Sequence, residues 1–124
     1  MTRIAVVDIG TNSTRLLVAE VGGGELRELA RESVVTRLGE GVDATGRLGD
    51  EPQARVFAAL DGFAEQIERH GATIRTAVMT SAVRDAANGA EFAATVRTRA
   101  KMAAMAVDNL LAALDGRPMP YPVA

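Results

Sequence analysis

The sequence contains no cysteine and a single histidine, His70. The lack of cysteine excludes disulfide bonds, cysteine nucleophiles and thiolate metal sites, and one histidine cannot form a two-histidine metal site. Aromatic residues make up 3% of the 124 residues, with three Phe, one Tyr and no Trp. The core must therefore be built from Ala, Val, Leu and Ile, and we expect a domain of modest stability.

A long apolar segment and a dominant charge are also missing. No apolar run approaches the roughly 18 residues of a membrane-spanning helix, and Asp8 lies within what would be the apolar segment of a signal peptide. We therefore expect a cytoplasmic protein with no membrane partner. The 14 Lys and Arg residues against 16 Asp and Glu residues give a formal net charge of −2, which leaves no broad basic face for nucleic acid. A small phosphate pocket needs only backbone N–H groups and one or two arginines, so it fits this composition.

The first third of the chain has the pattern of three consecutive strands. A continuous apolar run over residues 4–9 predicts a strand buried on both faces. Residues 14–21 and about 25–36 predict two more strands, and the short connections between them indicate an antiparallel meander. Residues 37–49 contain four glycines and are typical of a loop.

A helix and a fourth strand follow. The helix is expected over residues 52–69, with Asp50 as its N-cap and Gly71 after its C-terminus. Its apolar side chains recur on one face: Val56, Leu60, Phe63 and Ile67. Residues 73–79 predict a strand parallel to the first and beside it, because a helix separates it from the meander. The fold class is therefore α/β, with a mixed sheet in the order 3-2-1-4.

The last part of the chain has a helical pattern. It begins at Ala82, pauses at Asn88-Gly89 and resumes with a broad apolar stripe, which predicts a long C-terminal helix that ends before Pro118. The stripe consists of Val96, Met102, Met105, Ala106, Leu110 and Leu114.

The connection between the first two strands is rich in polar groups. Gly10 would permit a positive φ and a close approach of a ligand to the backbone, and Thr11, Asn12 and Ser13 offer hydroxyl, amide and backbone donors. Consecutive N–H groups in a tight turn form an anion-binding concavity, and Asp8 suits a Mg²⁺ ion that bridges to phosphate oxygens. The same residue types also make a good hairpin turn in which Asp8 bonds its own backbone, and chemistry alone favours this turn over a phosphate site.

Four stretches resemble one enzyme family. Residues 3–16 are similar to the opening of the exopolyphosphatase and guanosine pentaphosphate phosphatase (Ppx/GppA) family. Residues 35–42 resemble its arginine-and-glycine loop, residues 46–48 the lead-in to its first helix, and residues 79–92 its second signature. These stretches occur in the family's order and spacing, and the resemblance covers residues 3–97.

The resemblance implies a truncated ribonuclease-H-like lobe of the actin-like ATPase superfamily. Members of the family split a terminal phosphoanhydride of polyphosphate or a guanosine phosphate with water and Mg²⁺. Carried onto this chain, Asp8 resembles the metal-side carboxylate. The implied phosphate-binding residues are Gly10, Thr11, Asn12, Ser13, Arg15, Thr80, Ser81 and Arg84. By residue type alone, Arg84 is better interpreted as a surface arginine paired with Asp85 or Glu91, and it is the motif context that favours phosphate binding.

The family's general-base glutamate and its second glycine-rich phosphate loop do not follow in this chain, so no catalytic set is complete. We therefore expect the chain alone to be inactive or very weakly active. The alternative function is a non-enzymatic module. It would self-associate, as a homodimer for example, through an exposed edge of the fourth strand or through the C-terminal helix.

The end of the chain resembles a second, unrelated family. Residues 98–124 are similar to the C-terminal helix and Pro-rich tail of D-2-hydroxyacid dehydrogenases, whose catalytic residues and nucleotide loop are missing here. No dehydrogenase activity is implied. We therefore expect two parts, a partial phosphatase lobe over residues 1–97 and an appended helix and tail over residues 98–124, joined by a fusion near residues 97–100.

Overall fold

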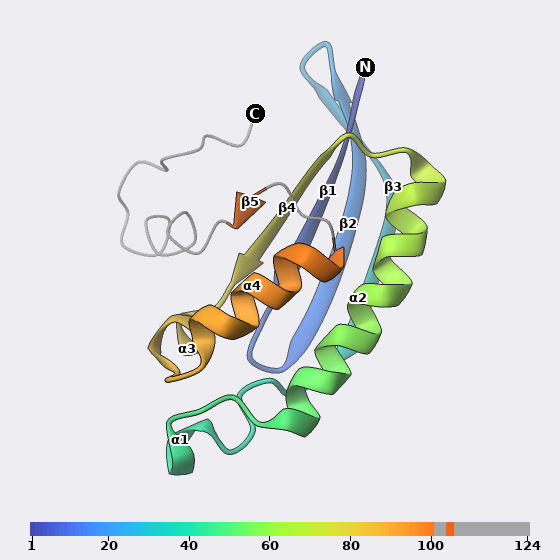
Figure 1. The fold of residues 1–124 in the computed structure, drawn as a ribbon. Helices are drawn as coiled ribbons and strands as arrows, with labels where there is room; N and C mark the ends of the chain where they lie inside the picture. The colour runs from blue at the N-terminus through green and yellow to red at the C-terminus, as the bar shows by residue number, and fades with distance from the viewer. Residues whose placement is uncertain (101–103, 106–124) are drawn as a thin grey trace.

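A mixed five-stranded sheet with the strand order β3-β2-β1-β4-β5 carries the fold (Figure 1). The computed structural model describes residues 1–100 and 104–105. Three strands form the antiparallel meander: β1 (Thr2–Ile9), β2 (Ser13–Gly22) and β3 (Glu25–Val35). Strand β4 (Ile74–Met79) lies beside β1 and parallel to it, and β5 (Ala104–Met105) extends the sheet beyond β4. The predicted order 3-2-1-4 is confirmed.

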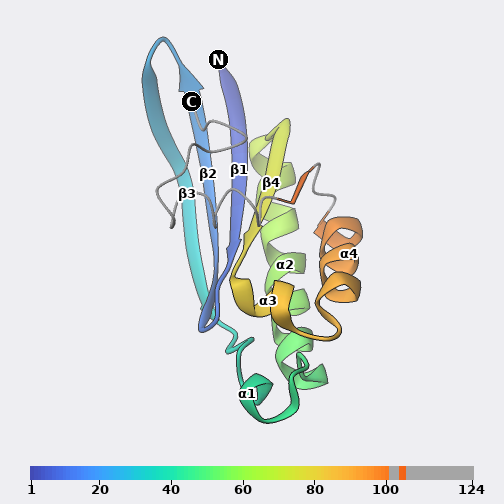
Figure 2. The same ribbon diagram turned by 90° about the vertical axis from the view of Figure 1, so that its left-hand side faces the viewer.

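The helices of the described residues are α1 (Val42–Thr45), α2 (Asp50–His70), α3 (Ser81–Asp85) and α4 (Gly89–Ala100). Figure 2 shows that α2 and α4 lie on the same side of the sheet. They pack against each other through the Phe57 and Phe92 rings, whose centroids are 5.4 Å apart, and the Arg99 guanidinium lies 5.1 Å from the Phe57 centroid. Within the described part of the chain, no helix has the length and apolar character needed to cross a membrane.

The core lies between the sheet and these two helices. On β1 it takes Ala5, Val7 and Ile9, each fully buried. All four predicted core positions of α2 are buried as well: Val56, Leu60, Phe63 and Ile67. The prediction that β1 is buried on both faces is wrong: the described helices cover one face, and on the other face Val6 is half-buried and Asp8 is exposed.

Both ends of α2 are set by glycines. Gly71 ends the helix in the left-handed conformation (φ 65°), as predicted. The prediction of Asp50 as N-cap is wrong, because Gly49 in extended conformation precedes the helix and Asp50 is its first residue. Asp50 and Glu51 then lie in the first turn, where negative charge is favourable beside the unpaired N–H groups.

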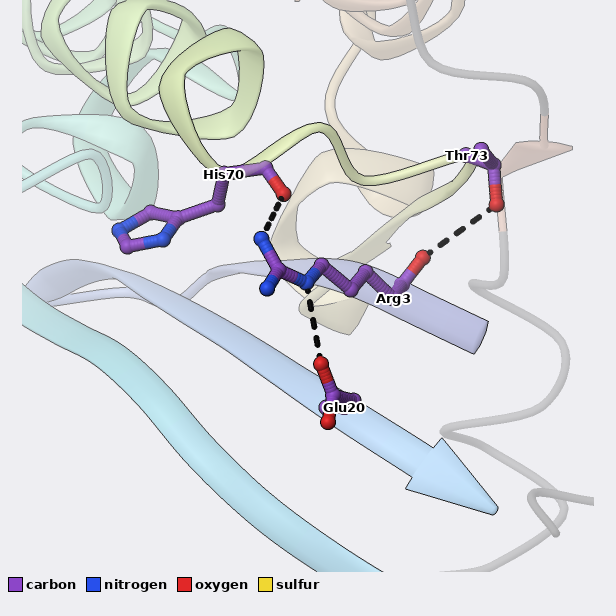
Figure 3. A network of polar contacts seen from close by, with 4 residues as sticks. All are labelled: Arg3, Glu20, His70 and Thr73. Carbon is purple, nitrogen blue, oxygen red and sulfur yellow. Dashed lines mark hydrogen bonds and ion pairs between the residues drawn. The ribbon is translucent and has the colours of Figure 1, made fainter. Parts of the chain in front are cut away.

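A polar cluster joins the start of β1 to the end of α2 (Figure 3). The Arg3 guanidinium donates to Glu20 Oε2 on β2 (3.2 Å) and to the carbonyl oxygen of His70 (2.8 Å). The backbone N–H of Thr73 donates to the Arg3 carbonyl (3.0 Å). These bonds stabilise the end of the sheet that lies opposite the β1–β2 turn. They also help to fix the register in which β4 pairs with β1.

Three predictions in the connections and at the C-terminus need correction. The loop over residues 37–49 contains α1, which is bracketed by Gly41 (φ 80°) and Gly46 (φ 70°). Strand β4 is not an open edge along its whole length, because Thr76 and Ala77 pair with β5. The long C-terminal helix is wrong at Ala104–Met105, which form a strand, and its predicted continuation lies outside the described residues.

Candidate functional site

The two sequence motifs meet at one rim of the sheet. Strands β1 and β4 are parallel neighbours, so their carboxyl ends lie side by side, and the N–H of Thr80 donates to the carbonyl of Ile9 (3.2 Å). The turn from β1 to β2 leaves from this rim, and α3 begins there with Ser81. The fold thus brings the residues predicted around positions 8–15 and 80–84 to the same edge.

The turn between β1 and β2 is tight. The N–H of Gly10 donates to the carbonyl of Ser13 (2.8 Å), so Thr11 and Asn12 form the tip, and both are exposed. Gly10 does not use the positive φ that a glycine permits, because its φ is not in the left-handed region. Glycine is needed here for space, because a Cβ on Gly10 would lie 2.9 Å from the Ser13 carbonyl oxygen.

The carbonyl groups at the tip are occupied by the segment that follows β3. The Asn12 carbonyl accepts hydrogen bonds from the N–H groups of Thr36 and Arg37 (3.0 Å each), and the Thr11 carbonyl accepts one from Gly39 (3.1 Å). In contrast, the N–H groups of Thr11 and Asn12 donate to no acceptor among residues 1–100 and 104–105. A turn whose carbonyls are bonded on one side and whose amides are free is suited to bind an anion.

Buried hydroxyls and an arginine hold that supporting segment in place. The Thr14 and Thr36 side chains are fully buried, and their Oγ1 atoms lie 2.9 Å apart, so one hydroxyl donates a hydrogen bond to the other. Arg55 on α2 donates to the Thr36 carbonyl (2.8 Å) and to Glu40 Oε2 (3.1 Å). The turn is therefore braced through β2, through the segment over residues 36–40 and through α2.

Asp8 and Arg15 are register partners in the β1–β2 ladder, and both are exposed. Paired residues of neighbouring strands share a face, and this face is the one turned away from α2 and α4. Within the described part of the chain, no group of three or more His, Asp or Glu side chains could hold a metal ion. A single carboxylate still fits Mg²⁺, which commonly keeps its waters and is held by one carboxylate together with phosphate oxygens.

The residues of the second motif, Thr80, Ser81 and Arg84, lie at the rim, but Arg84 is already engaged in an ion pair. Thr80 precedes α3 in extended conformation, and its Oγ1 is buried without a hydrogen-bond partner in the part of the chain described. Arg84 donates through Nε to Asp85 Oδ1 (3.1 Å) on the surface, which is the pairing that residue type alone left open. The backbone of Ser81 begins α3.

Two residues outside the predicted set shape the site. Arg37 adopts a left-handed backbone (φ 51°) directly behind the turn. The Asn88 side chain accepts from the Leu48 N–H (2.8 Å) and donates to the Leu48 carbonyl (3.0 Å), which ties the α3–α4 connection to the segment before α2. Both residues lie within the stretches that resemble the family, and this location is the one feature of the sequence that could have identified them as part of the site.

Comparison with known proteins identifies the chain's relatives. Exopolyphosphatase 2 of Mycobacterium tuberculosis is 45% identical over 120 residues, which cover 94% of this chain and 34% of that protein. A crystal structure of the Aquifex aeolicus Ppx/GppA phosphatase matches with a TM-score of 0.78 and 30% identity, over 85% of this chain and 35% of that one. An exopolyphosphatase-like protein matches with a TM-score of 0.82 and 34% identity, over 90% of this chain and 34% of that one.

The chain thus spans about a third of the length of these relatives. Its mixed sheet and packing helices form a partial lobe of the actin-like ATPase fold, as predicted. The sequence model described as the Ppx/GppA phosphatase family matches residues 17–109. That match continues past residue 97 and gives no support to a fusion there, just as α4 runs unbroken to Ala100. With three-quarters of its length matched and its fold shared, the chain belongs to the Ppx/GppA phosphatase family.

Proposed function

We propose that this chain is the phosphate-binding part of a phosphatase that acts on terminal phosphoanhydrides, and that the turn at Thr11 and Asn12 binds the terminal phosphate. The observation that carries the proposal is the pair of N–H groups at the tip that have no acceptor among the described residues, while the neighbouring carbonyls are bonded to residues 36–39. The names of the relatives, exopolyphosphatases in several cases, support polyphosphate as the substrate class. A guanosine phosphate presents the same terminal group.

The surrounding residues would each contribute a defined interaction. Gly10 lets the turn close, and Ser13 adds a hydroxyl beside its tip. Arg15 and Arg84 would supply positive charge. Arg84 would first have to break its ion pair with Asp85. Thr80 Oγ1, which lacks a partner in the described part of the chain, supplies a hydroxyl at the same rim, next to the Ser81 that begins α3.

A Mg²⁺ ion would be held by Asp8 and by its own waters, and it would neutralise charge on the phosphate oxygens. The chain's own residues position the phosphate group but include no assigned base for the attacking water. We therefore propose binding with little or no turnover by this chain alone. Self-association as an alternative function gains no support, since β5 pairs with part of the β4 edge.

Titration with tripolyphosphate, followed by NMR in the presence and absence of Mg²⁺, tests the site. We expect millimolar-range binding, because the groups are exposed and exposed charge contacts contribute about 1 kcal/mol or less. Amide shifts should be confined to residues 8–15, 36–39 and 80–85. The absence of shifts at those residues at high ligand concentration would show that the turn serves only as a connection.

Two variants sharpen this experiment. Gly10→Val should abolish binding, because a side chain at this position would collide with the Ser13 carbonyl oxygen. Gly62→Ala, on α2 with nothing within 4 Å of the added Cβ, is the control and should bind as the parent does. Arg84→Ala should weaken binding without a change in melting temperature, whereas Arg97→Ala, which removes the same charge from α4, should not. Equal affinities for the two arginine variants would remove Arg84 from the site.

A further inference from the structure

Arg37 lies directly behind the phosphate turn. Its N–H donates to the Asn12 carbonyl (3.0 Å), and the flanking residues Thr36 and Gly39 donate to the same two-residue tip. A Cβ on Gly39 would lie 2.4 Å from Thr11 Cγ2, so this segment and the tip are in close contact. The backbone around Arg37 is thus fixed against the carbonyl groups of the same two residues, Thr11 and Asn12, whose amides have no acceptor in the described part of the chain.

The backbone conformation of Arg37 is unfavourable for an arginine. Its φ of 51° is the sole positive value at a non-glycine residue within the described part of the chain. The other left-handed positions there are glycines: Gly23, Gly24, Gly41, Gly46 and Gly71. Glycine adopts this conformation without steric cost, whereas a residue with a Cβ is strained in it. Backbone strain at one position beside the proposed ligand-binding turn is typical of a residue whose side chain has a functional role.

The fold itself makes no use of the Arg37 guanidinium. The residue is exposed, and its side chain has no hydrogen bond or ion pair with residues 1–100 or 104–105. The acidic neighbour that follows it, Glu40, is bonded to Arg55 (3.1 Å). Within the described part of the chain, this segment therefore carries an unpaired positive side chain whose backbone is bonded to the tip.

We infer that Arg37 contacts a second phosphoryl group of the bound ligand, next to the one held by the Thr11 and Asn12 amides. This inference rests on the proposed function. It assigns to Arg37 a preference of the site for phosphate chains over a single phosphate. An arginine suits the role, because its planar guanidinium is always charged and can form two parallel hydrogen bonds to a phosphoryl group.

The test compares the affinities for orthophosphate and tripolyphosphate in the full chain and in three variants. Arg37→Gly removes the side chain and relieves the strained φ, and Arg37→Asn removes the charge with a residue that tolerates the left-handed region. Both should weaken tripolyphosphate binding by about three- to fivefold, the size of an exposed charge contact, and leave orthophosphate binding unchanged. Arg27→Ala, on exposed β3 near the opposite end of the sheet, removes the same charge and should leave both affinities unchanged.

Thermal melting separates a binding role from a structural one. If Arg37 serves the ligand, Arg37→Gly melts at or above the temperature of the parent chain. A lower melting temperature with unchanged tripolyphosphate affinity would overturn the inference, and so would an equal loss of affinity for both ligands. If the parent chain binds neither ligand, the proposed function itself fails. If the parent binds both and Arg37→Gly binds them equally well, only the assignment of Arg37 fails.

Discussion

At the scale of single residues, several glycines of this chain are required because neighbouring atoms leave no room for a Cβ, and not because their backbone φ is positive. A Cβ on Gly89, the first residue of α4, would lie 1.6 Å from the Val83 carbonyl oxygen, far inside any tolerable contact. Gly10 is a milder case at 2.9 Å from the Ser13 oxygen. Sequence alone indicates a turn at both positions, but it does not reveal the atom that excludes a side chain, because the position of that atom is known only once the backbone has folded.

We predict opposite effects for the same substitution at two helical glycines. Gly89→Ala should lower the free energy of unfolding by about 3 kcal/mol or more, since the α3–α4 connection must shift to admit the methyl group. Gly62→Ala, in α2 with open space around its Cβ, should raise it by about 0.5–1 kcal/mol, because alanine loses less backbone entropy in a helix. Urea denaturation monitored by circular dichroism measures both, and similar midpoints for the two variants would refute the steric argument.

At the scale of elements, local patterns predict those helices and strands that obey a simple period. Helix α2 follows from its apolar spacing and from Gly71, and the meander follows from two short polar turns. The pattern predicts a helix where β5 lies, because Ala104–Met105 belongs to an alanine-rich stretch with helical periodicity. Its pairing with Thr76 and Ala77 is a tertiary contact that overrides local propensity.

The same distinction applies to the site. The turn over residues 10–13 and the rim shared by β1 and β4 could be predicted from the motif and from the parallel pairing. The feature on which the proposed anion site depends is the bonding of the turn's carbonyls to residues 36–39, and it requires a segment more than twenty residues away to return to the turn. The left-handed Arg37 belongs to that return, so no local pattern revealed it.

A single side chain joins two of the elements that frame the rim. Asn88 bonds both backbone groups of Leu48, and Ala87 N–H donates to the Gly46 carbonyl (2.9 Å). We predict that Asn88→Ala lowers the free energy of unfolding by about 1–3 kcal/mol, because the partly buried Leu48 N–H loses its acceptor, whereas the Leu48 carbonyl keeps the hydrogen bond donated by Gln53 Nε2 (3.0 Å). Asn88→Asp keeps the acceptor and loses the donor, and it should cost less. Denaturation midpoints check the order, and equal costs for the two variants would show that the donated bond carries the whole effect.

At the scale of the whole molecule, the helices of the described residues lie on one face of the sheet, and none of them lies on the other face. The consequence is visible within β1, where alternate residues point to opposite faces. Val7 faces α2 and is fully buried, whereas its neighbour Val6 is half-buried on the face that also bears Asp8 and Arg15. The two valines are adjacent residues of the same strand. A substitution at each therefore measures how much burial on one face of the sheet contributes to stability.

We predict that Val7→Ala lowers the free energy of unfolding by about 2 kcal/mol, since it removes two methyl groups from a packed core and leaves a cavity. Val6→Ala should cost about 1 kcal/mol or less, because much of its surface already meets water in the folded chain. The two are compared by urea denaturation at several protein concentrations. Equal costs for the two variants would show that a further part of the chain covers the Val6 face in solution. If the cost of Val6→Ala instead grows with protein concentration, a second copy of the chain covers that face, and either result would contradict a core built on one side of the sheet only.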